Sequence, residues 1–196
     1  MTPEEWACEV HFFEEPNGDL NGLYEALLFV LKLAKTQKYQ VDVDLLIKIH
    51  SIFMRSSNKK SRIRRPGENV FAYKLNHLTG KADNKEIVTY TPGGSLVVSQ
   101  INELLCRTPA ATTATQTIAQ WLRDFLLIHP FTDGNGRMAH LLWVLFTYNN
   151  HNKTLTSICN YNFPHHSKQL HLNARQIYII ALQNDKFFTE WVSLCS

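Results

Sequence analysis

The sequence predicts a mainly α-helical single domain that carries one β-hairpin. Apolar residues recur at spacings of three and four along most of the chain, as on the buried face of a helix. Only residues 69–91 alternate, weakly, between apolar and polar side chains, which favours paired strands. The 196 residues, 44% of them hydrophobic, are enough to bury one full core but too few for a second full domain.

Turn and cap signals divide the first part of the chain. Turn formers at 16–18 separate an aromatic lead-in from a helix expected at about 19–36. Asp42 or Asp44 can cap the next helix, which we expect to run through Met54. The segment SSNKKSRIRRPGEN then predicts a polar loop. We expect its basic run to be a solvated face, with a contact to nucleotide or an acidic target as the alternative; the run comprises Lys59, Lys60, Arg62, Arg64 and Arg65.

Glycine, proline and apolar spacing mark the elements that follow. Within the hairpin, turns are expected at His77 to Gly80 and at Asp83 to Asn84, and Pro-Gly-Gly at 92–94 ends the strand. A helix around Val97 to Leu105 comes next, and TTATQTIAQWLRDFLLI predicts the helix that delivers His129. After a polar break at 149–153, further helices are expected at about 165–183 and from 187 onward.

The most informative segment is HPFTDGNGRMAH, residues 129–140, which joins two predicted helices. Gly134 and Gly136 let backbone amides approach an anion closely, and the apolar spacing after them marks a buried helix that begins near Asn135. The free N–H groups and the positive dipole end of a helix start are well suited to phosphate oxygens. Arg137 adds a permanent charge whose fork matches phosphate geometry.

Two further residues of this segment supply acid–base and metal chemistry. His129 can take a proton near neutral pH and lies outside the predicted helix. Asp133 can cap the helix or hold Mg²⁺ against a diphosphate. Each residue alone is more often structural, since Asp is a common helix cap and an Arg in a first turn is often solvated. The combination, however, predicts a phosphate-transfer site.

This segment resembles the Fic family motif HPFx[DE]GNGRxxR, with His129, Pro130, Phe131, Asp133 and the GNGR run at 134–137 in register. The resemblance extends to LLIKIHSIFM at 45–54, to EIVTYTPGGSLVVSQINELL at 86–105 and to IYIIALQNDKFFTEWV near the C-terminus. It implies a Fic-type helical bundle with a β-hairpin flap beside the active site. A single Fic-like domain would span residues 1–196, with its core at about 42–192 and an N-terminal helical extension at 1–41.

The resemblance also implies a protein adenylyltransferase that uses Mg²⁺ and ATP to transfer AMP to a Ser, Thr or Tyr hydroxyl of a target protein. His129 would be the catalytic base, Asp133 would hold Mg²⁺, and Phe131 would anchor the loop in the core. The amides of residues 134–136 and the Asn135 side chain would line an anion hole, and Arg137 would grip the leaving phosphates. The residues expected to bind nucleotide phosphates are thus Gly134, Asn135, Gly136, Arg137 and His140.

The implied flap would align the target through main-chain hydrogen bonds, and its residues are Ile87, Val88, Thr89, Tyr90 and Thr91. Asn173 and Arg175, on a predicted C-terminal helix, are candidates for adenine or ribose contacts by position alone. The expected partners are a nucleotide donor and a protein target with a hydroxyl side chain.

His140 stands where the family motif has its last arginine. In the family this arginine faces the terminal phosphate and can pair with an inhibitory glutamate from a [ST]xxxE[GN] helix, a motif that this sequence lacks in intact form. An imidazole is shorter and has no bidentate fork, so its grip on a γ-phosphate should be weaker. The absence of both the last motif arginine and the inhibitory-glutamate motif predicts an enzyme that is not restrained in cis. A separate inhibitory chain is a further potential partner.

The same replacement leaves other interpretations open. The donor could be another diphosphate compound, so that the chain transfers UMP or phosphocholine, or the chain could be a catalytically weak binding module with a Fic fold. His140 itself is expected either to contact the ligand or to be a buried histidine early in the helix.

Composition argues against several other classes of protein. A net charge of +3 suits a polyanionic nucleotide but is small for a nucleic-acid-binding surface, so we assign no role to nucleic acid. The four cysteines have no CxxC spacing and suggest neither a zinc site nor a disulfide framework. We find no secretory signal and no membrane-spanning run, so we expect a cytoplasmic protein without membrane contacts, and delivery into another cell stays open.

Overall fold

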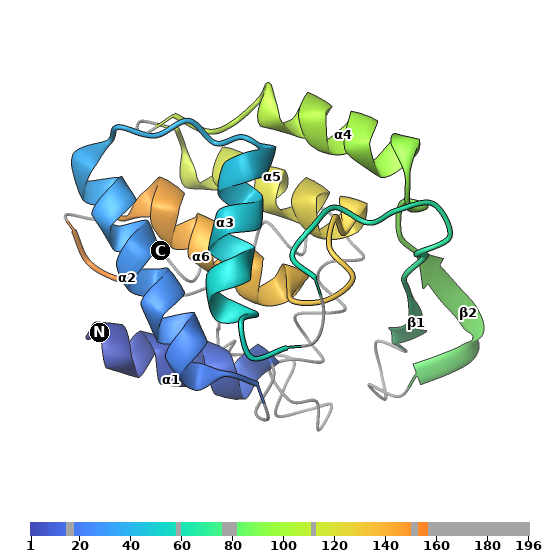
Figure 1. Cartoon of the computed structure of the whole chain (residues 1–196), viewed down its shortest axis with the longest axis horizontal. Coiled ribbons are helices and arrows are strands. Elements are labelled where there is room, and N and C mark those ends of the chain that lie inside the picture. Colours follow the sequence, from blue (N-terminus) through green and yellow to red (C-terminus); the bar gives the residue numbers. More distant parts are fainter. Residues whose placement is uncertain (15–17, 58–59, 76–81, 111–112, 150–152, 157–196) are drawn as a thin grey trace.

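The structure, a computed structural model, describes residues 1–14, 18–57, 60–75, 82–110, 113–149 and 153–156 (Figure 1). The elements are α1 Pro3–Glu14, α2 Leu20–Thr36, α3 Val43–Phe53, β1 Phe71–Leu75, β2 Ala82–Thr89, α4 Ser95–Leu105, α5 Thr115–Ile128 and α6 Asn135–Thr147. The mainly helical fold that the sequence predicts is confirmed. The helices predicted at 165–183 and from 187 onward, together with Asn173 and Arg175, lie outside the described residues.

Helix α6 lies at the centre of the helical body. It packs against α5, α2 and α1, and every residue of α6 except Gly136 is buried. A helix that is apolar around most of its circumference has to lie inside a core. Because α6 begins at Asn135, as the sequence predicts, the core fixes both the position and the direction of its N-terminus. None of the described helices is long and apolar enough to cross a membrane.

Aspartate caps set where α2 and α3 begin. The Asp19 carboxylate accepts a hydrogen bond from the Gly22 N–H at 2.8 Å, and the Asp42 carboxylate accepts one from the Leu45 N–H at 2.8 Å. Asp42, rather than Asp44, is therefore the cap of α3. The α2–α3 pair brings the C-terminal end of α3 to the connection between α5 and α6 (Figure 1).

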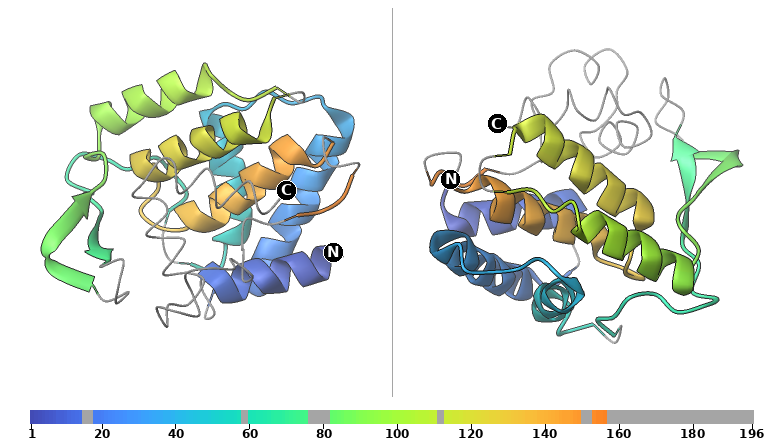
Figure 2. Two further views of the ribbon diagram at one scale, coloured as in Figure 1. Left: turned by 180° about the vertical axis from the view of Figure 1, so that it is seen from behind. Right: turned by 90° about the horizontal axis from the view of Figure 1, so that it is seen from above.

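Strands β1 and β2 form an antiparallel hairpin at one side of the helical body (Figure 2). Phe71 pairs with Thr89 and Lys74 pairs with Asp83, and the register shifts between Tyr73 and Lys74. Residues 83–84 lie within β2, so the turn predicted at Asp83 and Asn84 is wrong; the shifted register accommodates these polar residues in the strand. The turn predicted at 77–80 lies outside the described residues. The role of this hairpin as a flap stays a prediction.

Candidate active site

The connection from α5 to α6 is closed by a pair of hydrogen bonds between Phe131 and Asn135. The Phe131 N–H donates to Asn135 Oδ1 at 3.0 Å, and Asn135 Nδ2 donates to the Phe131 carbonyl at 2.9 Å. Phe131 is fully buried, as expected for a loop anchor, and Asn135 is 1% exposed. This pair uses Oδ1 and one of the two Nδ2–H groups of the Asn135 amide, so the side chain braces the loop. Its expected place in an anion hole stays a prediction.

His129 ends α5 in the left-handed conformation, with φ 52° and ψ 60°. Its Nδ1 lies 3.2 Å from the Leu126 carbonyl, which can only accept, so Nδ1 carries the proton and Nε2 keeps its lone pair. Burial lowers the pKa of His129 to about 4, and the nearby charge of Arg64 acts in the same direction. The imidazole is therefore neutral at physiological pH, in the form that can accept a proton.

Tyr90, directly after β2, covers one face of this imidazole. The two rings are stacked with their centroids 4.1 Å apart and an interplanar angle of 25°. Burial, followed by the charge of Glu14, raises the pKa of the Tyr90 phenol. Of the expected flap residues, the structure thus brings Tyr90 to His129, whereas the side chains of Ile87, Val88 and Thr89 lie outside the described part of the chain.

Arg64 fastens the backbone around His129, a role that the sequence did not predict. Its guanidinium is 1% exposed and donates to the carbonyls of His129 at 2.6 Å, Glu68 at 2.8 Å and Ile128 at 3.0 Å, and also to that of Thr91. The Arg64 N–H donates to the Pro130 carbonyl at 2.9 Å. One buried cation therefore ties together the end of α5 and the end of the hairpin.

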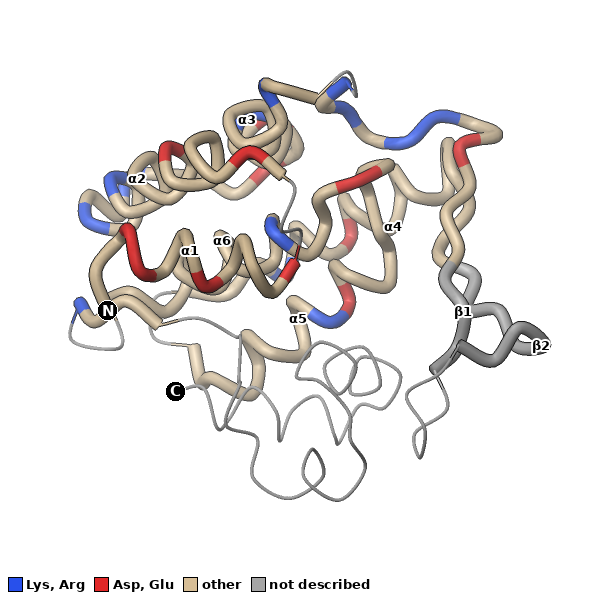
Figure 3. The backbone as a smooth tube through the Cα atoms, turned by 90° about the horizontal axis from the view of Figure 1, so that it is seen from below, with Lys and Arg blue, Asp and Glu red and all other residues tan. Residues whose placement is uncertain are grey.

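The prediction that the whole basic run is solvated is wrong for Arg64. The Lys and Arg positions from 60 to 65 follow one another along the connection between α3 and β1 (Figure 3). Lys60 and Arg65 are exposed and Arg62 is partly exposed, but Arg64 turns inward because four backbone carbonyls converge on it. Lys59 lies outside the described residues.

His50, on α3, supports the same connection from the opposite side. Its Nε2 donates to the Asp133 carbonyl at 2.9 Å, so its Nδ1 accepts from the Ser61 hydroxyl at 2.8 Å. The ring stacks on Phe131 with centroids 4.0 Å apart, and burial lowers the pKa of His50 to about 4. The sequence offers a signal for this residue, since His50 shares the helical spacing of the buried Leu46 and Phe53.

The two glycines at the start of α6 let neighbouring side chains lie directly against its backbone. Gly134 has φ 75°, and a Cβ there would lie 2.8 Å from a Phe53 ring carbon. A Cβ on Gly136 would overlap the Glu14 carboxylate. Glu14, the last residue of α1, therefore places an anion against the first turn of α6, where the sequence predicts phosphate oxygens.

His140 also contacts Glu14, with 3.1 Å between His140 Nε2 and Glu14 Oε1. The His140 side chain is fully buried and meets Phe13 edge-on, with ring centroids 5.8 Å apart. Of the two interpretations of His140, the structure favours the buried histidine. The sequence contains no intact [ST]xxxE[GN] motif, and this absence predicts an enzyme that is not restrained in cis. In the structure, however, Glu14 reaches His140 from α1, whose sequence does not match that motif.

Asp133 and Arg137 border a cavity of about 450 Å³ that also reaches Asp19 and Met54. Arg137 is 5% exposed and lies 5.2 Å over the Phe53 ring, and its guanidinium is 3.7 Å from the Asp133 carboxylate. Asp133 does not act as the side-chain cap of α6, since the cap residue is Gly134. Its carboxylate is 31% exposed and accepts from the Gly134 N–H at 2.7 Å.

Asp133 fits the requirements of Mg²⁺, which usually takes one or two carboxylates together with substrate phosphates and water. Among the described residues there is no group of three or more His, Cys, Asp or Glu side chains that could hold a metal ion. The protein part of a Mg²⁺ site here would therefore be small, and the donor phosphates would have to complete it.

The profile of the Fic/DOC family matches residues 40–147. Among solved structures, Fic-1 from C. elegans is similar with a TM-score of 0.58 and 19% identity, covering 90% of this chain and 47% of that chain. A Fic family protein from Desulfovibrio desulfuricans G20 has a TM-score of 0.59 and 16% identity over 87% of this chain and 49% of that chain.

A Fic-domain signaling protein from Bacteroides thetaiotaomicron VPI-5482 has a TM-score of 0.52 and 14% identity, over 91% of this chain and 70% of that chain. This chain thus spans about half the length of the first two structures. A search of the curated proteins gave no match. The structural likeness shows the shared fold, and the profile match extends over more than half of the sequence, so the chain belongs to the Fic/DOC family.

Proposed function

We propose that this chain is a protein nucleotidyltransferase that moves AMP from ATP, with Mg²⁺, to a Ser, Thr or Tyr hydroxyl of a target protein. Members of the Fic family generally transfer nucleotides or other groups onto proteins. The observation that carries the proposal is the neutral imidazole of His129 beside a glycine-lined helix start that already holds a carboxylate. A place that accepts the Glu14 carboxylate has the electrostatics to accept phosphate oxygens.

In the proposed reaction the acceptor hydroxyl attacks the α-phosphorus of the donor. Nε2 of His129 takes the hydroxyl proton, and the bond between the α-phosphorus and the bridging oxygen breaks to release pyrophosphate. Arg137 stabilises the charge of the leaving phosphates, and Asp133 would hold Mg²⁺, which neutralises the diphosphate when bound. The negative charge of the donor also raises the pKa of His129 and so makes it a stronger base in the complex.

In our proposal, Glu14 inhibits transfer in the described conformation, because its carboxylate occupies part of the phosphate site. Its carboxylate lies against Gly136 and His140, so a phosphate group and Glu14 would compete for the same start of α6. We expect Glu14→Ala to raise the rate of transfer by at least about tenfold, which corresponds to 1.4 kcal/mol of relieved competition. Intact-mass spectrometry after incubation with ATP, Mg²⁺ and candidate targets measures the AMP adduct on the target or on the chain itself.

The matched control is Glu4→Ala, which removes a carboxylate from the exposed first turn of the same helix and should leave the rate unchanged. His140→Arg restores the family motif and should strengthen binding of the γ-phosphate. If no adduct forms with the native chain, with Glu14→Ala or with His140→Arg, the transferase proposal fails.

One observation favours a second candidate, a transferase with a different diphosphate donor. His140 is fully buried against Glu14 and has no guanidinium fork to offer to a γ-phosphate. A donor that lacks a γ-phosphate would lose nothing by this replacement. Competition of ATP against UTP and CDP-choline, with the adduct mass as the readout, identifies the donor. Calorimetric titration that finds no Mg²⁺-dependent binding of any nucleotide would instead support an inert binding module.

A further inference from the structure

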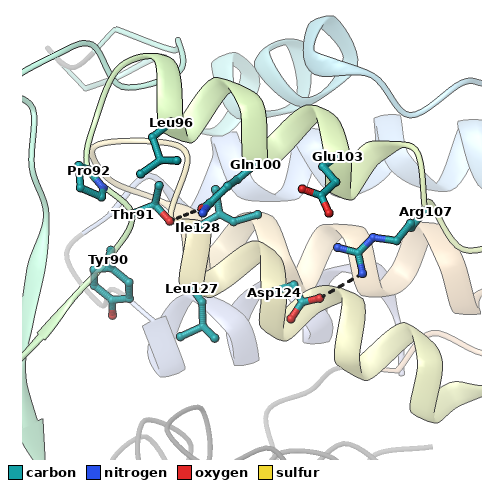
Figure 4. A pocket seen from close by; sticks show the side chains of 10 residues that line it. All are labelled: Tyr90, Thr91, Pro92, Leu96, Gln100, Glu103, Arg107, Asp124, Leu127 and Ile128. Carbon is teal, nitrogen blue, oxygen red and sulfur yellow. Dashed lines mark hydrogen bonds and ion pairs between the residues drawn. The ribbon is translucent and has the colours of Figure 1, made fainter.

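A groove of about 610 Å³ opens between α4 and α5 (Figure 4). One of the residues that line it is Tyr90, which stacks on the His129 ring. Its end nearest the imidazole is apolar and is lined by Tyr90, Pro92, Leu96, Leu127 and Ile128. Ile128 directly precedes His129. Leu96 is 47% exposed, so its aliphatic side chain is accessible to a ligand in the groove. The apolar end of the groove therefore lies next to the proposed base, at the two residues that adjoin His129.

The far end of the groove is charged. Glu103 and Arg107 project from α4 and its C-terminal end, and Asp124 faces them from α5 (Figure 4). The Asp124 carboxylate accepts from Gln120 Nε2 at 3.1 Å and lies 3.8 Å from the Arg107 guanidinium. The Glu103 carboxylate has no hydrogen bond or ion pair with any residue that the structure describes. This end carries two acidic groups and one basic group, so its uncompensated charge is negative.

The spacing of the two ends defines the length of the ligand. Leu96 and Glu103 are seven residues apart on α4, which is about 10 Å at a rise of 1.5 Å per residue. An extended peptide advances about 3.3 Å per residue and covers that distance in about three residues. A nucleotide does not suit this groove, because its phosphates would meet the negative end.

We propose that this groove binds the target-protein segment beside the acceptor hydroxyl, and that it selects an aliphatic side chain next to the hydroxyl residue and a Lys or Arg about three residues further along. The proposal rests on the transferase function, because that function requires a hydroxyl residue at His129. The aliphatic side chain packs against Leu96 and Leu127, and the basic side chain pairs with Glu103.

Fluorescence anisotropy with labelled peptides tests the charge preference without any nucleotide. One pair of peptides contains Thr-Leu-Ala-Ala-Lys or Thr-Leu-Ala-Ala-Glu. A second pair has these sequences in reverse order, since the groove does not fix the chain direction. An exposed ion pair contributes up to about 1 kcal/mol, so the native protein should bind the Lys peptide about two- to fivefold more tightly than the Glu peptide. Glu103→Lys should invert this preference, and Leu96→Asp should weaken binding of the Lys peptide in the preferred direction.

Asp44→Lys is the matched control, because it makes the same change of charge at an exposed position on α3, outside the groove. It should retain the native preference. The proposal is overturned if the native chain binds none of the peptides, or if Glu103→Lys keeps the native preference. Because binding is measured without donor, a chain that transfers nothing still tests the groove. Conversely, a chain that modifies Lys and Glu peptides equally retains its transferase function and lacks the proposed selectivity.

Discussion

The two ends of the segment from His129 to His140 are held in different ways. At the His129 end, hydrogen bonds from the Arg64 guanidinium to the carbonyls of Ile128 and His129 fix the chain. At the α6 end, the Glu14 carboxylate lies against Gly136, where we propose that a donor phosphate binds. The first end is therefore held by hydrogen bonds to its backbone, whereas the second contacts a carboxylate that, in our proposal, a donor phosphate displaces.

The largest effect should come from removing the proposed base at the fixed end. His129→Ala should lower the rate of transfer by about 10²- to 10⁴-fold, the usual contribution of a general base, and leave nucleotide affinity near the native value. Rates from adduct mass and affinities from calorimetry separate the two quantities. Transfer at the native rate in His129→Ala would remove His129 from the mechanism.

Arg64 gives the next largest effect, on folding stability as well as on transfer. Arg64→Met keeps the length of the side chain but leaves carbonyl groups of Ile128, His129, Glu68 and Thr91 without their donor, and should lower the free energy of unfolding by about 3 kcal/mol. Urea denaturation measures this change. Arg65→Met, at the exposed neighbouring position, should change it by less than about 0.5 kcal/mol. Equal effects of the two substitutions would contradict the role assigned to Arg64.

The contrast between the two ends also shows what the sequence could predict. The order of His129, Asp133, Gly134 and Arg137 specifies a loop before a buried helix start, and the structure has that helix start at Asn135. Arg64 is one of several basic residues in a polar run, and nothing local distinguishes the one on which carbonyls converge. Glu14 precedes His140 by 126 residues in the sequence, so only the packing of α1 against α6 reveals the contact between them.

Two histidines, His50 beside this segment and His129 within it, should also make stability depend on pH. The pKa of His50 is lowered from 6.5 to about 4, and that of His129 is lowered similarly, so between these values the unfolded chain binds more protons than the folded one. The free energy of unfolding should therefore fall as the pH is lowered from 6.5 towards 4, by at most about 3 kcal/mol for the 2% exposed His50. Urea denaturation across this range should show a shallower slope for His50→Asn, and an unchanged slope would show that His50 does not contribute.

The smallest effect is expected at Asp133, whose side chain accepts a hydrogen bond from the Gly134 N–H and lies 3.7 Å from the Arg137 guanidinium. Asp133→Ala should weaken nucleotide binding several-fold when Mg²⁺ is present and change it little when Mg²⁺ is absent, because the proposed carboxylate contact is to the metal and not to the nucleotide. Calorimetry with and without Mg²⁺ gives both affinities. Asp133→Asn is the matched control, since it removes the negative charge but keeps the size of the side chain and a potential acceptor for the Gly134 N–H. It therefore separates the contact with Mg²⁺ from the support of the loop. A loss of affinity that is the same without Mg²⁺ would instead mean that Asp133 acts by shaping the loop, and the α6 end would then be as rigidly built as the His129 end.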